Sequence, residues 1–187
     1  MAGFFKKLFG GSDDTAAQTP APAATPAVPS AAGASALTAH MNGTVVELAG
    51  VSDQMFASGA LGPGAAIEPT SGVVVAPADG EVTVAFPTGH AFGIRTADGL
   101  EILIHVGFDT VELDGKFFEP KVKKGDTVTR GQVLVEFDLE QVKAAGYPVT
   151  TPLVITNAKS SVADLTVANA GSDVAVGADF ITAARKG

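Results

Sequence analysis

The chain has 187 residues, of which 46% are hydrophobic and 17% charged, enough apolar side chains for one packed domain and too many for general disorder. Its formal net charge of −8 argues against nucleic-acid binding, because contact with phosphates needs clustered cations. The absence of cysteine excludes disulfides, thiol catalysis and cysteine-ligated metals, which leaves histidine, carboxylates and hydroxyls for chemistry.

Residues 1–11 form a short segment that is both basic and apolar. Its large apolar side chains recur at helical spacing around two lysines: Phe4, Phe5, Leu8 and Phe9, with Lys6 and Lys7 between them. The segment is too short and too charged to span a bilayer. The pattern favours an amphipathic helix that makes weak contact with an anionic membrane surface, although a helix packed on the domain would have the same pattern.

Residues 12–36 are predicted to be an Ala/Pro-rich linker. From Thr15 to Ala36 the chain carries no charge and consists mostly of alanine, proline, threonine and serine. Such a segment buries too little apolar surface to offset the entropy of ordering it, so we expect a flexible, semi-extended tether. The folded domain is predicted to occupy residues 37–187.

From residue 37 onward the sequence is typical of an all-β protein. Short runs of Val, Ile, Phe and Thr are separated by glycine-containing turns. The predicted strands are, in chain order, 44–48, 72–75, 81–86, 91–96, 101–106, 133–137, 152–156 and 162–167. One short helix is predicted at 139–145, with Asp138 as its N-cap and Gly146 after its end. Many short strands with frequent turns indicate a β-sandwich or barrel with short helical turns.

The Asp98-Gly99 pair is the strongest hairpin signal in the chain, between predicted strands 91–96 and 101–106. With these two residues as the loop, Ala97 pairs with Leu100. The facing pairs further along are then His105 with Phe92, His90 with Gly107, and Thr88 with Asp109.

This register places two of the three histidines on one face as diagonal neighbours, with Cα atoms about 7–8 Å apart. The same prediction holds for a four-residue loop. A three-residue loop would break it, because a register shift of one residue moves side chains to the other face. The third histidine, His40, has no such partner and is expected to be a surface residue.

Several chemistries use a pair of histidines. A catalytic zinc site needs a third protein ligand, for which Asp109 is a candidate, but the sequence lacks the H-x-H and H-E-x-x-H spacings of zinc hydrolases. There is also no nucleophile-elbow motif for serine hydrolysis. The remaining chemistry is covalent catalysis by an imidazole that attacks phosphorus, while the second histidine donates a hydrogen bond to the phosphoryl oxygens.

Six stretches around and beyond the histidine pair form recognisable motifs: Val-Ala-Pro-Ala-Asp-Gly at 75–80, Gly-His-Ala-Phe at 89–92, Ile-His-Val-Gly-Phe-Asp-Thr-Val-Glu-Leu at 104–113, Lys-Gly-Asp at 124–126, Glu-Phe-Asp-Leu at 136–139 and Thr-Pro-Leu-Val-Ile-Thr-Asn at 151–157. They resemble the motifs of glucose-type IIA phosphocarrier proteins of the bacterial sugar phosphotransferase system. The resemblance runs from about Gly43 to Phe180. The chain departs from the family at Val106, where phenylalanine is more common, at Gly93, which is commonly polar, and in its longer tether.

The resemblance implies an antiparallel β-sandwich and a role for each site residue. By this analogy His105 is phosphorylated on Nε2, His90 supports the transfer, and Thr88 hydrogen-bonds the pair. The protein would be a phosphotransferase component without a cofactor. It would accept phosphate from HPr and pass it to a cysteine on a IIB domain of a sugar-transporting permease, in the cytoplasm or peripherally at the inner face of the cell membrane.

Such a carrier needs a shallow apolar face that its partners can cover. Candidates for this rim are Asp53, Met55, Phe56, Phe86, Phe92, Val106 and Asp109, with the two aspartates meeting basic residues of the partners. The resemblance further implies that the unphosphorylated form can bind and regulate other proteins, and that His90 and His105 can jointly hold zinc in a complex. Two alternatives remain open: a zinc-dependent peptidase of related β-architecture, and a purely regulatory binding module.

Overall fold

The computed structural model describes residues 33–187, so the predicted helix at 1–11 and most of the predicted linker lie outside the described residues. The strands are β1 Ala34–Thr38, β2 Gly43–Val46, β3 Gly64–Pro69, β4 Val73–Val75, β5 Gly80–Ala85, β6 Ala91–Thr96, β7 Glu101–His105, β8 Phe118–Pro120, β9 Thr127–Val128, β10 Val133–Phe137, β11 Thr151–Ile155, β12 Val162–Val167, β13 Asp173–Val174 and β14 Asp179–Arg185. The helices are η1 Leu48–Gly50, α1 Gln54–Ala57, η2 Thr110–Leu113, α2 Leu139–Ala144 and α3 Ala158–Ser161. None of the helices among these residues is long and apolar enough to cross a membrane.

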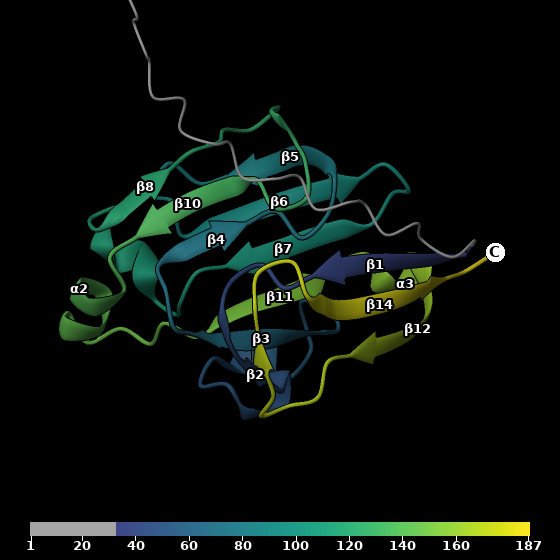
Figure 1. Ribbon diagram of the computed structural model, residues 1–187, viewed down its shortest axis with the longest axis horizontal. Coiled ribbons are helices and arrows are strands. Elements are labelled where there is room, and N and C mark those ends of the chain that lie inside the picture. The colour runs from purple at the N-terminus through teal and green to yellow at the C-terminus, as the bar shows by residue number, and fades with distance from the viewer. Residues whose placement is uncertain (1–32) are drawn as a thin grey trace, which may run out of the picture.

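The strands form one large antiparallel sheet and two small ones. The large sheet has the order β13-β2-β3-β11-β7-β6-β5-β9, and the small sheets have the orders β1-β14-β12 and β4-β10-β8. In Figure 1 the two small sheets lie over one face of the large sheet. The antiparallel β-sandwich implied by the resemblance is therefore confirmed.

The core fills the space between these sheets. It takes residues from all three sheets, as strand alternation requires: Val45, Ile67, Phe92, Ile94, Ile102, Ile104 and Leu153 from the large sheet, Leu37, Phe180 and Ile181 from one small sheet, and Val74, Leu134 and Phe137 from the other. A second, smaller cluster lies on the outer face of the large sheet and contains Leu48, Val51, Phe56, Ala66, Phe108 and Val154. Strand β7 contributes to both faces and carries one of the candidate histidines at its end.

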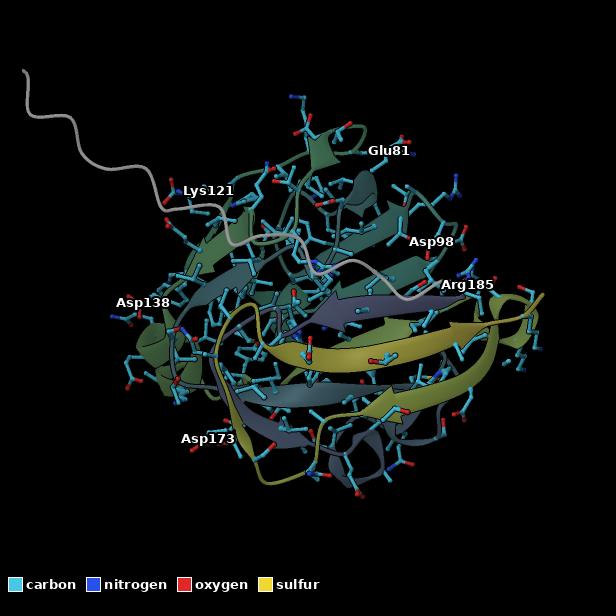
Figure 2. The ribbon with its side chains drawn as sticks, turned by 45° about the vertical axis from the view of Figure 1, so that its right-hand side comes forward. Glu81, Asp98, Lys121, Asp138, Asp173 and Arg185 are labelled. Carbon is cyan, nitrogen blue, oxygen red and sulfur yellow. The ribbon has the colours of Figure 1, made fainter. Side chains whose placement is uncertain are left out.

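The N-terminal boundary of the folded domain differs from the prediction. Strand β1 begins at Ala34 and pairs with β14, so residues 34–36 belong to the sheet and not to the linker. The start of β1 is tied to the β6–β7 hairpin, because the Ser35 hydroxyl donates to the Asp98 carboxylate. Arg185 at the end of β14 donates to the Asp98 carbonyl oxygen at 2.5 Å, and Figure 2 shows these two residues side by side. These tertiary contacts order residues whose composition alone indicates a tether.

His40 is a core residue, and the expectation of a surface position is wrong. Its side chain is 0% exposed, its ring lies 5.6 Å from that of Phe180, and its Nε2 donates to the Thr151 carbonyl oxygen at 3.2 Å. The Nδ1 atom has no hydrogen-bond partner among the described residues. Burial lowers the pKa of His40 to about 4, and the bond to Thr151 offsets part of that effect. His40 is therefore neutral in the folded protein at neutral pH.

His40 should make the fold sensitive to acid. Between about pH 6.5 and pH 4 the unfolded chain binds a proton at His40 and the folded protein does not, so the free energy of unfolding falls as the pH falls. The pKa difference corresponds to a loss of about 3 kcal/mol across this window. Urea unfolding at several pH values should show a steeper pH dependence for the wild type than for His40→Gln, whose side chain cannot titrate. Equal pH slopes in the two proteins would contradict this assignment.

Candidate active site

The β6–β7 hairpin has a different register from the one predicted. His105 lies opposite Ala91, and Phe92 lies opposite Ile104. The pairing is shifted by one residue from the prediction, which placed His105 opposite Phe92. The register prediction is therefore wrong, together with the diagonal geometry that was deduced from it.

The shift arises because the hairpin has a three-residue loop. Thr96 and Leu100 close the loop through a Thr96 N–H to Leu100 carbonyl bond of 2.9 Å, and the Gly99 N–H donates to the Thr96 carbonyl at 2.9 Å. Gly99 is left-handed at φ +84°, whereas Asp98 does not have a positive φ. A two-residue type I′ turn would need a positive φ at both Asp98 and Gly99. Asp98 is instead the last central residue of a type I turn, and Gly99 is the left-handed residue that follows it.

His90 and His105 are nevertheless in contact. Their ring centroids are 5.2 Å apart, and the ring planes meet at 66° in an edge-to-face arrangement. His90 precedes the first residue of β6 and follows Gly89, which is left-handed at φ +72°. The regular alternation of a strand therefore does not govern His90, so the prediction that the two histidines meet is confirmed although its derivation was wrong.

Strand β7 presents His105 on the outer face of the large sheet. Ile102 and Ile104 point into the main core, while Leu103 packs against the outer cluster and His105 shares its face. The Phe56 ring packs edge-to-face with His105, with centroids 5.7 Å apart. His105 is half-buried, so its ring is held by packing and still reaches the surface.

A backbone carbonyl fixes the tautomer of His105. The Nδ1 atom lies 2.7 Å from the carbonyl oxygen of Gly107, which can only accept a hydrogen bond, so Nδ1 carries the proton. In the neutral ring, Nε2 then keeps a free lone pair. Burial lowers the pKa of His105, and this outweighs the opposing effects of the Gly107 carbonyl and of the Asp53 and Asp109 carboxylates. His105 is therefore a neutral imidazole with a nucleophilic Nε2 at neutral pH.

His90 is held by Thr88 on one side and Phe86 on the other. The Thr88 Oγ1 atom lies 2.5 Å from His90 Nδ1, and the Phe86 ring centroid is 4.8 Å from that of His90. Burial lowers the pKa of His90, and a positive charge on His105 lowers it further. The resemblance assigned the hydrogen bond from Thr88 to the histidine pair, and the structure shows it at His90.

The predicted apolar rim is only partly formed by the residues named for it. Phe86 is 45% exposed and Met55 is 55% exposed, whereas Phe56 is 4% exposed and contacts the site through the His105 ring. Phe92 and Val106 are buried at 0% and 1% exposure, because both side chains point into the main core. The assignment of Phe92 and Val106 to the rim is therefore wrong.

The two candidate aspartates lie beside the histidines and have different local roles. The Oδ1 atom of Asp53 caps α1 by accepting from the N–H groups of Met55 and Phe56 at 2.8 and 3.2 Å. Asp109 is exposed and left-handed at φ 57°, and its side chain does not cap η2. The negative charge of both carboxylates raises the pKa of His105 and so opposes the larger effect of burial.

The sequence reasoning missed the backbone that supports His105. Gly107 is left-handed at φ +71°, and a Cβ there would lie 2.6 Å from the Pro148 carbonyl oxygen, so the position requires glycine. Thr110 is 1% exposed and donates from Oγ1 to the Val106 carbonyl at 2.6 Å. The signal was present in the sequence as a glycine two residues after the histidine, followed three residues later by a threonine.

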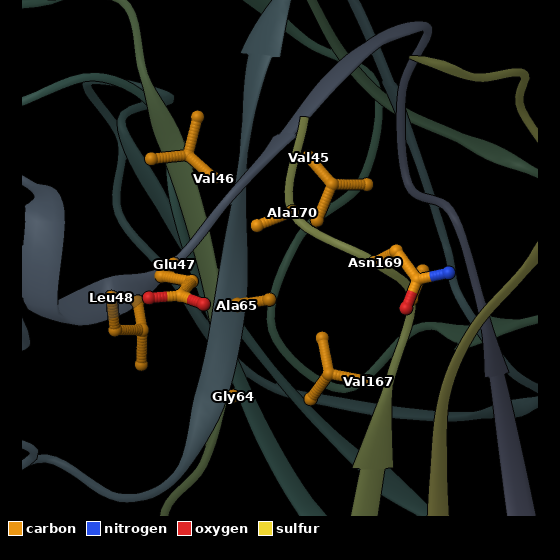
Figure 3. Close-up of a pocket in the computed structure, with 10 residues that line it drawn as sticks. Val45, Val46, Glu47, Leu48, Gly64, Ala65, Val167, Asn169 and Ala170 are labelled. Atoms are coloured by element: carbon orange, nitrogen blue, oxygen red, sulfur yellow. The ribbon is translucent and has the colours of Figure 1, made fainter. Parts of the chain in front are cut away.

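Neither His90, which is 5% exposed, nor His105, which is half-buried, lines the cleft of about 280 Å³ shown in Figure 3. That cleft lies between β2, β3 and the segment after β12, and its lining residues are mostly valine, alanine and glycine, with Glu47 and Asn169 as the polar ones. Within residues 33–187, no group of three His, Cys, Asp or Glu side chains is arranged to hold a metal ion.

Comparison with known proteins gives consistent matches. The family model described as phosphoenolpyruvate-dependent sugar phosphotransferase system, EIIA 1, matches residues 35–161. The β-glucoside-specific EIIBCA component of Halalkalibacterium halodurans is 50% identical over 123 residues, which cover 66% of this chain and 19% of that protein. The glucose-specific EIIA component of Bacillus cereus is 41% identical over 153 residues, or 82% of each chain. Among solved structures, glucose permease IIA from Mycoplasma capricolum matches with a TM-score of 0.75 and 38% identity, covering 80% of this chain and 95% of that one.

The chain therefore spans only 19% of the length of the β-glucoside relative but 82% of the glucose-specific one. The matched segment contains both histidines, the hairpin between them and the Gly107 turn. The sandwich fold, the paired imidazoles and the motifs around them agree with these matches. The chain belongs to the EIIA 1 family of the phosphoenolpyruvate-dependent sugar phosphotransferase system, as a glucose-type IIA component.

Proposed function

We propose that His105 carries a phosphoryl group between HPr and a IIB domain of a glucose-family permease. In the first half-reaction, a bond forms between phosphorus and Nε2 of His105 while the bond between phosphorus and the donor's phosphohistidine breaks. In the second half-reaction, a cysteine thiolate of the IIB domain attacks phosphorus and the bond to Nε2 breaks. The proton on Nδ1 of His105 stays in place throughout both steps.

One observation carries this proposal: Nδ1 of His105 donates to the Gly107 carbonyl, so Nε2 has a free lone pair in a neutral ring. An imidazole held in this tautomer needs no deprotonation before it attacks phosphorus. Its orientation is set by the sheet, the Gly107 turn and the Phe56 ring, and positioning supplies much of the catalysis in phosphoryl transfer.

His90 is suited to stabilise the charge of the transferred group. If the Thr88 hydroxyl donates to His90 Nδ1, the proton of the neutral ring lies on Nε2, where it is available to the phosphoryl oxygens. The edge-to-face contact of the two rings, with centroids 5.2 Å apart, supports this role for His90 beside the nucleophile. With the Thr88 hydroxyl as the donor, this bond would hold the tautomer of His90, as the Gly107 carbonyl holds that of His105.

Exposed and half-buried side chains near the pair form the proposed partner surface. Phe86 and Met55 offer apolar area, and Asp53 and Asp109 offer negative charge to basic residues of HPr and of the IIB domain.

A direct test combines purified HPr, enzyme I, phosphoenolpyruvate and a set of candidate IIB domains, and measures transfer to each. Transfer to at least one IIB domain is expected, and the preferred domain identifies the sugar system. Phosphorylation without transfer to any IIB domain would contradict the second half-reaction of the proposal and support only the first.

We further propose that residues 1–11 hold the protein at the inner face of the membrane, close to its permease. The apolar side chains of this segment would enter the lipid interface, and each lysine would contribute about 1 kcal/mol of attraction to acidic lipid. The chain between this segment and β1 would act as a tether that raises the effective concentration of the domain near the IIB partner.

Deletion of residues 1–11 should therefore leave phosphorylation by soluble HPr unchanged and slow transfer to a membrane-embedded permease. Co-sedimentation with anionic vesicles at low salt measures the membrane contact. The full-length chain should sediment with the vesicles and the deletion variant should not. If both remain in the supernatant, the segment has a different role.

A further inference from the structure

We propose that Thr110 is a positioning residue for the phosphoryl transfer, because its hydroxyl fixes the backbone turn whose carbonyl selects the tautomer of His105. The inference rests on the proposed function of His105. Thr110 itself does not touch the reacting atoms. It acts through the peptide groups on either side of Gly107, one hydrogen bond away from the histidine.

The peptide group between Gly107 and Phe108 is held at both ends. Its carbonyl oxygen accepts from His105 Nδ1 at 2.7 Å, and its N–H donates to the Pro148 carbonyl at 3.0 Å. Because the two groups of a planar trans peptide point in opposite directions, the bond to Pro148 directs the carbonyl toward His105. The orientation of this one peptide plane therefore decides whether Nδ1 has an acceptor.

Thr110 holds the preceding peptide group, between Val106 and Gly107. Its Oγ1 donates to the Val106 carbonyl at 2.6 Å, and Thr110 is 1% exposed. Strand β7 ends at His105, so Val106 lies beyond the strand. The donor that the structure shows for the Val106 carbonyl is the Thr110 hydroxyl. A buried carbonyl without a donor is unfavourable, so removal of the hydroxyl favours rotation of this peptide toward another partner.

Close packing links that rotation to the His105 acceptor. An added Cβ on Gly107 would lie 2.7 Å from Thr110 Cγ2 and 2.6 Å from the Pro148 carbonyl oxygen, so the turn is packed between these two residues. Gly107 can rotate because it has no side chain, and its left-handed φ of +71° is not intrinsically fixed. The Thr110 hydroxyl supplies the constraint that glycine itself lacks. Without this hydroxyl, the Gly107 carbonyl moves away from Nδ1. The ring of His105 can then carry its proton on Nε2, the atom that must attack phosphorus.

Three substitutions separate this role from simple packing. Thr110→Val keeps the shape and removes the hydroxyl, whereas Thr110→Ser keeps the hydroxyl and removes the methyl group. Thr38→Val is the matched control, because Thr38 is also a buried threonine whose hydroxyl donates to a carbonyl, that of Pro77 at 3.1 Å, and it belongs to β1. The tautomer is read from two-bond ¹H–¹⁵N correlations of the His105 ring in the unphosphorylated full-length chain, and the rate of labelling by phospho-HPr is measured in parallel.

We expect a pure Nδ1–H tautomer of His105 in the wild type, in Thr110→Ser and in Thr38→Val. In Thr110→Val we expect a mixture of tautomers and a loss of about tenfold or more in the labelling rate, with normal backbone spectra elsewhere. Thr110→Ala serves as a second variant without the hydroxyl if the valine variant does not fold.

The proposal is overturned if a folded Thr110→Val or Thr110→Ala keeps the wild-type tautomer and rate, or if neither variant folds. It is also overturned if Thr110→Ser fails to restore the tautomer. A wild-type protein that takes no label from phospho-HPr would instead overturn the proposed function. The tautomer measurement would still decide the role of Thr110, because it needs no phosphoryl donor.

Discussion

Replacement of His105 by alanine should abolish phosphorylation by phosphoenolpyruvate, enzyme I and HPr, while the fold remains intact. The variant lacks the only ring in the described structure whose Nδ1 is bound to the Gly107 carbonyl, so no other nitrogen is prepared to attack. His105 is half-buried, lies outside the main core and packs against Phe56, so its loss leaves the sandwich in place. Acid-labile ³²P labelling measures the first effect, and thermal unfolding measures the second.

His40→Gln is the matched control, since it removes a different histidine that lies in the core with Phe180. At neutral pH this variant should be labelled at the wild-type rate. Label that persists in His105→Ala, or that is lost from a folded His40→Gln, would show that the wrong histidine has been assigned.

Replacement of His90 by glutamine should separate the two half-reactions. We expect His90→Gln to accept phosphate from HPr and to pass it to a IIB domain about 10²–10³-fold more slowly, which is the usual cost of removing one donor from a charge-stabilising site. The reason is that the donor matters most when both partners crowd the phosphoryl group. Rapid-quench measurements of each half-reaction with purified partners give the two rates.

Thr88→Val tests the same mechanism one bond further away. It removes the hydroxyl that holds His90 Nδ1 and should slow onward transfer in the same direction as His90→Gln, by a smaller factor. If His90→Gln slows both half-reactions equally, His90 is a structural support for His105 and not a donor to the phosphoryl group.

The fold class was predictable because the short apolar runs and the glycine-containing turns between them both indicate an all-β protein. The strands that were predicted, such as β4, β7 and β10, are rich in valine, isoleucine, leucine and phenylalanine, which suit a pleated and partly buried surface. Two of the strands that were missed have another composition. β1 reads ASALT and β3 reads GAAIEP, and such small residues become strands because their neighbours in the sheet order them.

The site was predictable in its members but not in its geometry. The Asp98-Gly99 pair suits both a two-residue turn and the end of a three-residue loop, and the bonds closing the loop at Thr96 select the second. The register therefore shifted by one residue. The histidines still meet because His90 lies outside the strand, a feature that depends on the turn at Gly89 and that alternation cannot predict.

Burial was the property least accessible to the sequence reasoning. Phe92 and Val106 flank the histidines in sequence but point into the main core, and His40 is enclosed beside Phe180. Each position depends on which face of a strand or turn meets the opposite sheet, and a one-residue change in register reverses that assignment.

The central claim is that the phosphoryl group is carried on Nε2 of His105. The most direct test is ³¹P and ¹⁵N NMR of the protein labelled with ¹⁵N-histidine and phosphorylated through HPr. The account predicts that phosphorus couples to Nε2 of His105, while Nδ1 of the same ring keeps its proton and its bond to Gly107. Coupling of phosphorus to Nδ1 of His105, or to either nitrogen of His90, would contradict it.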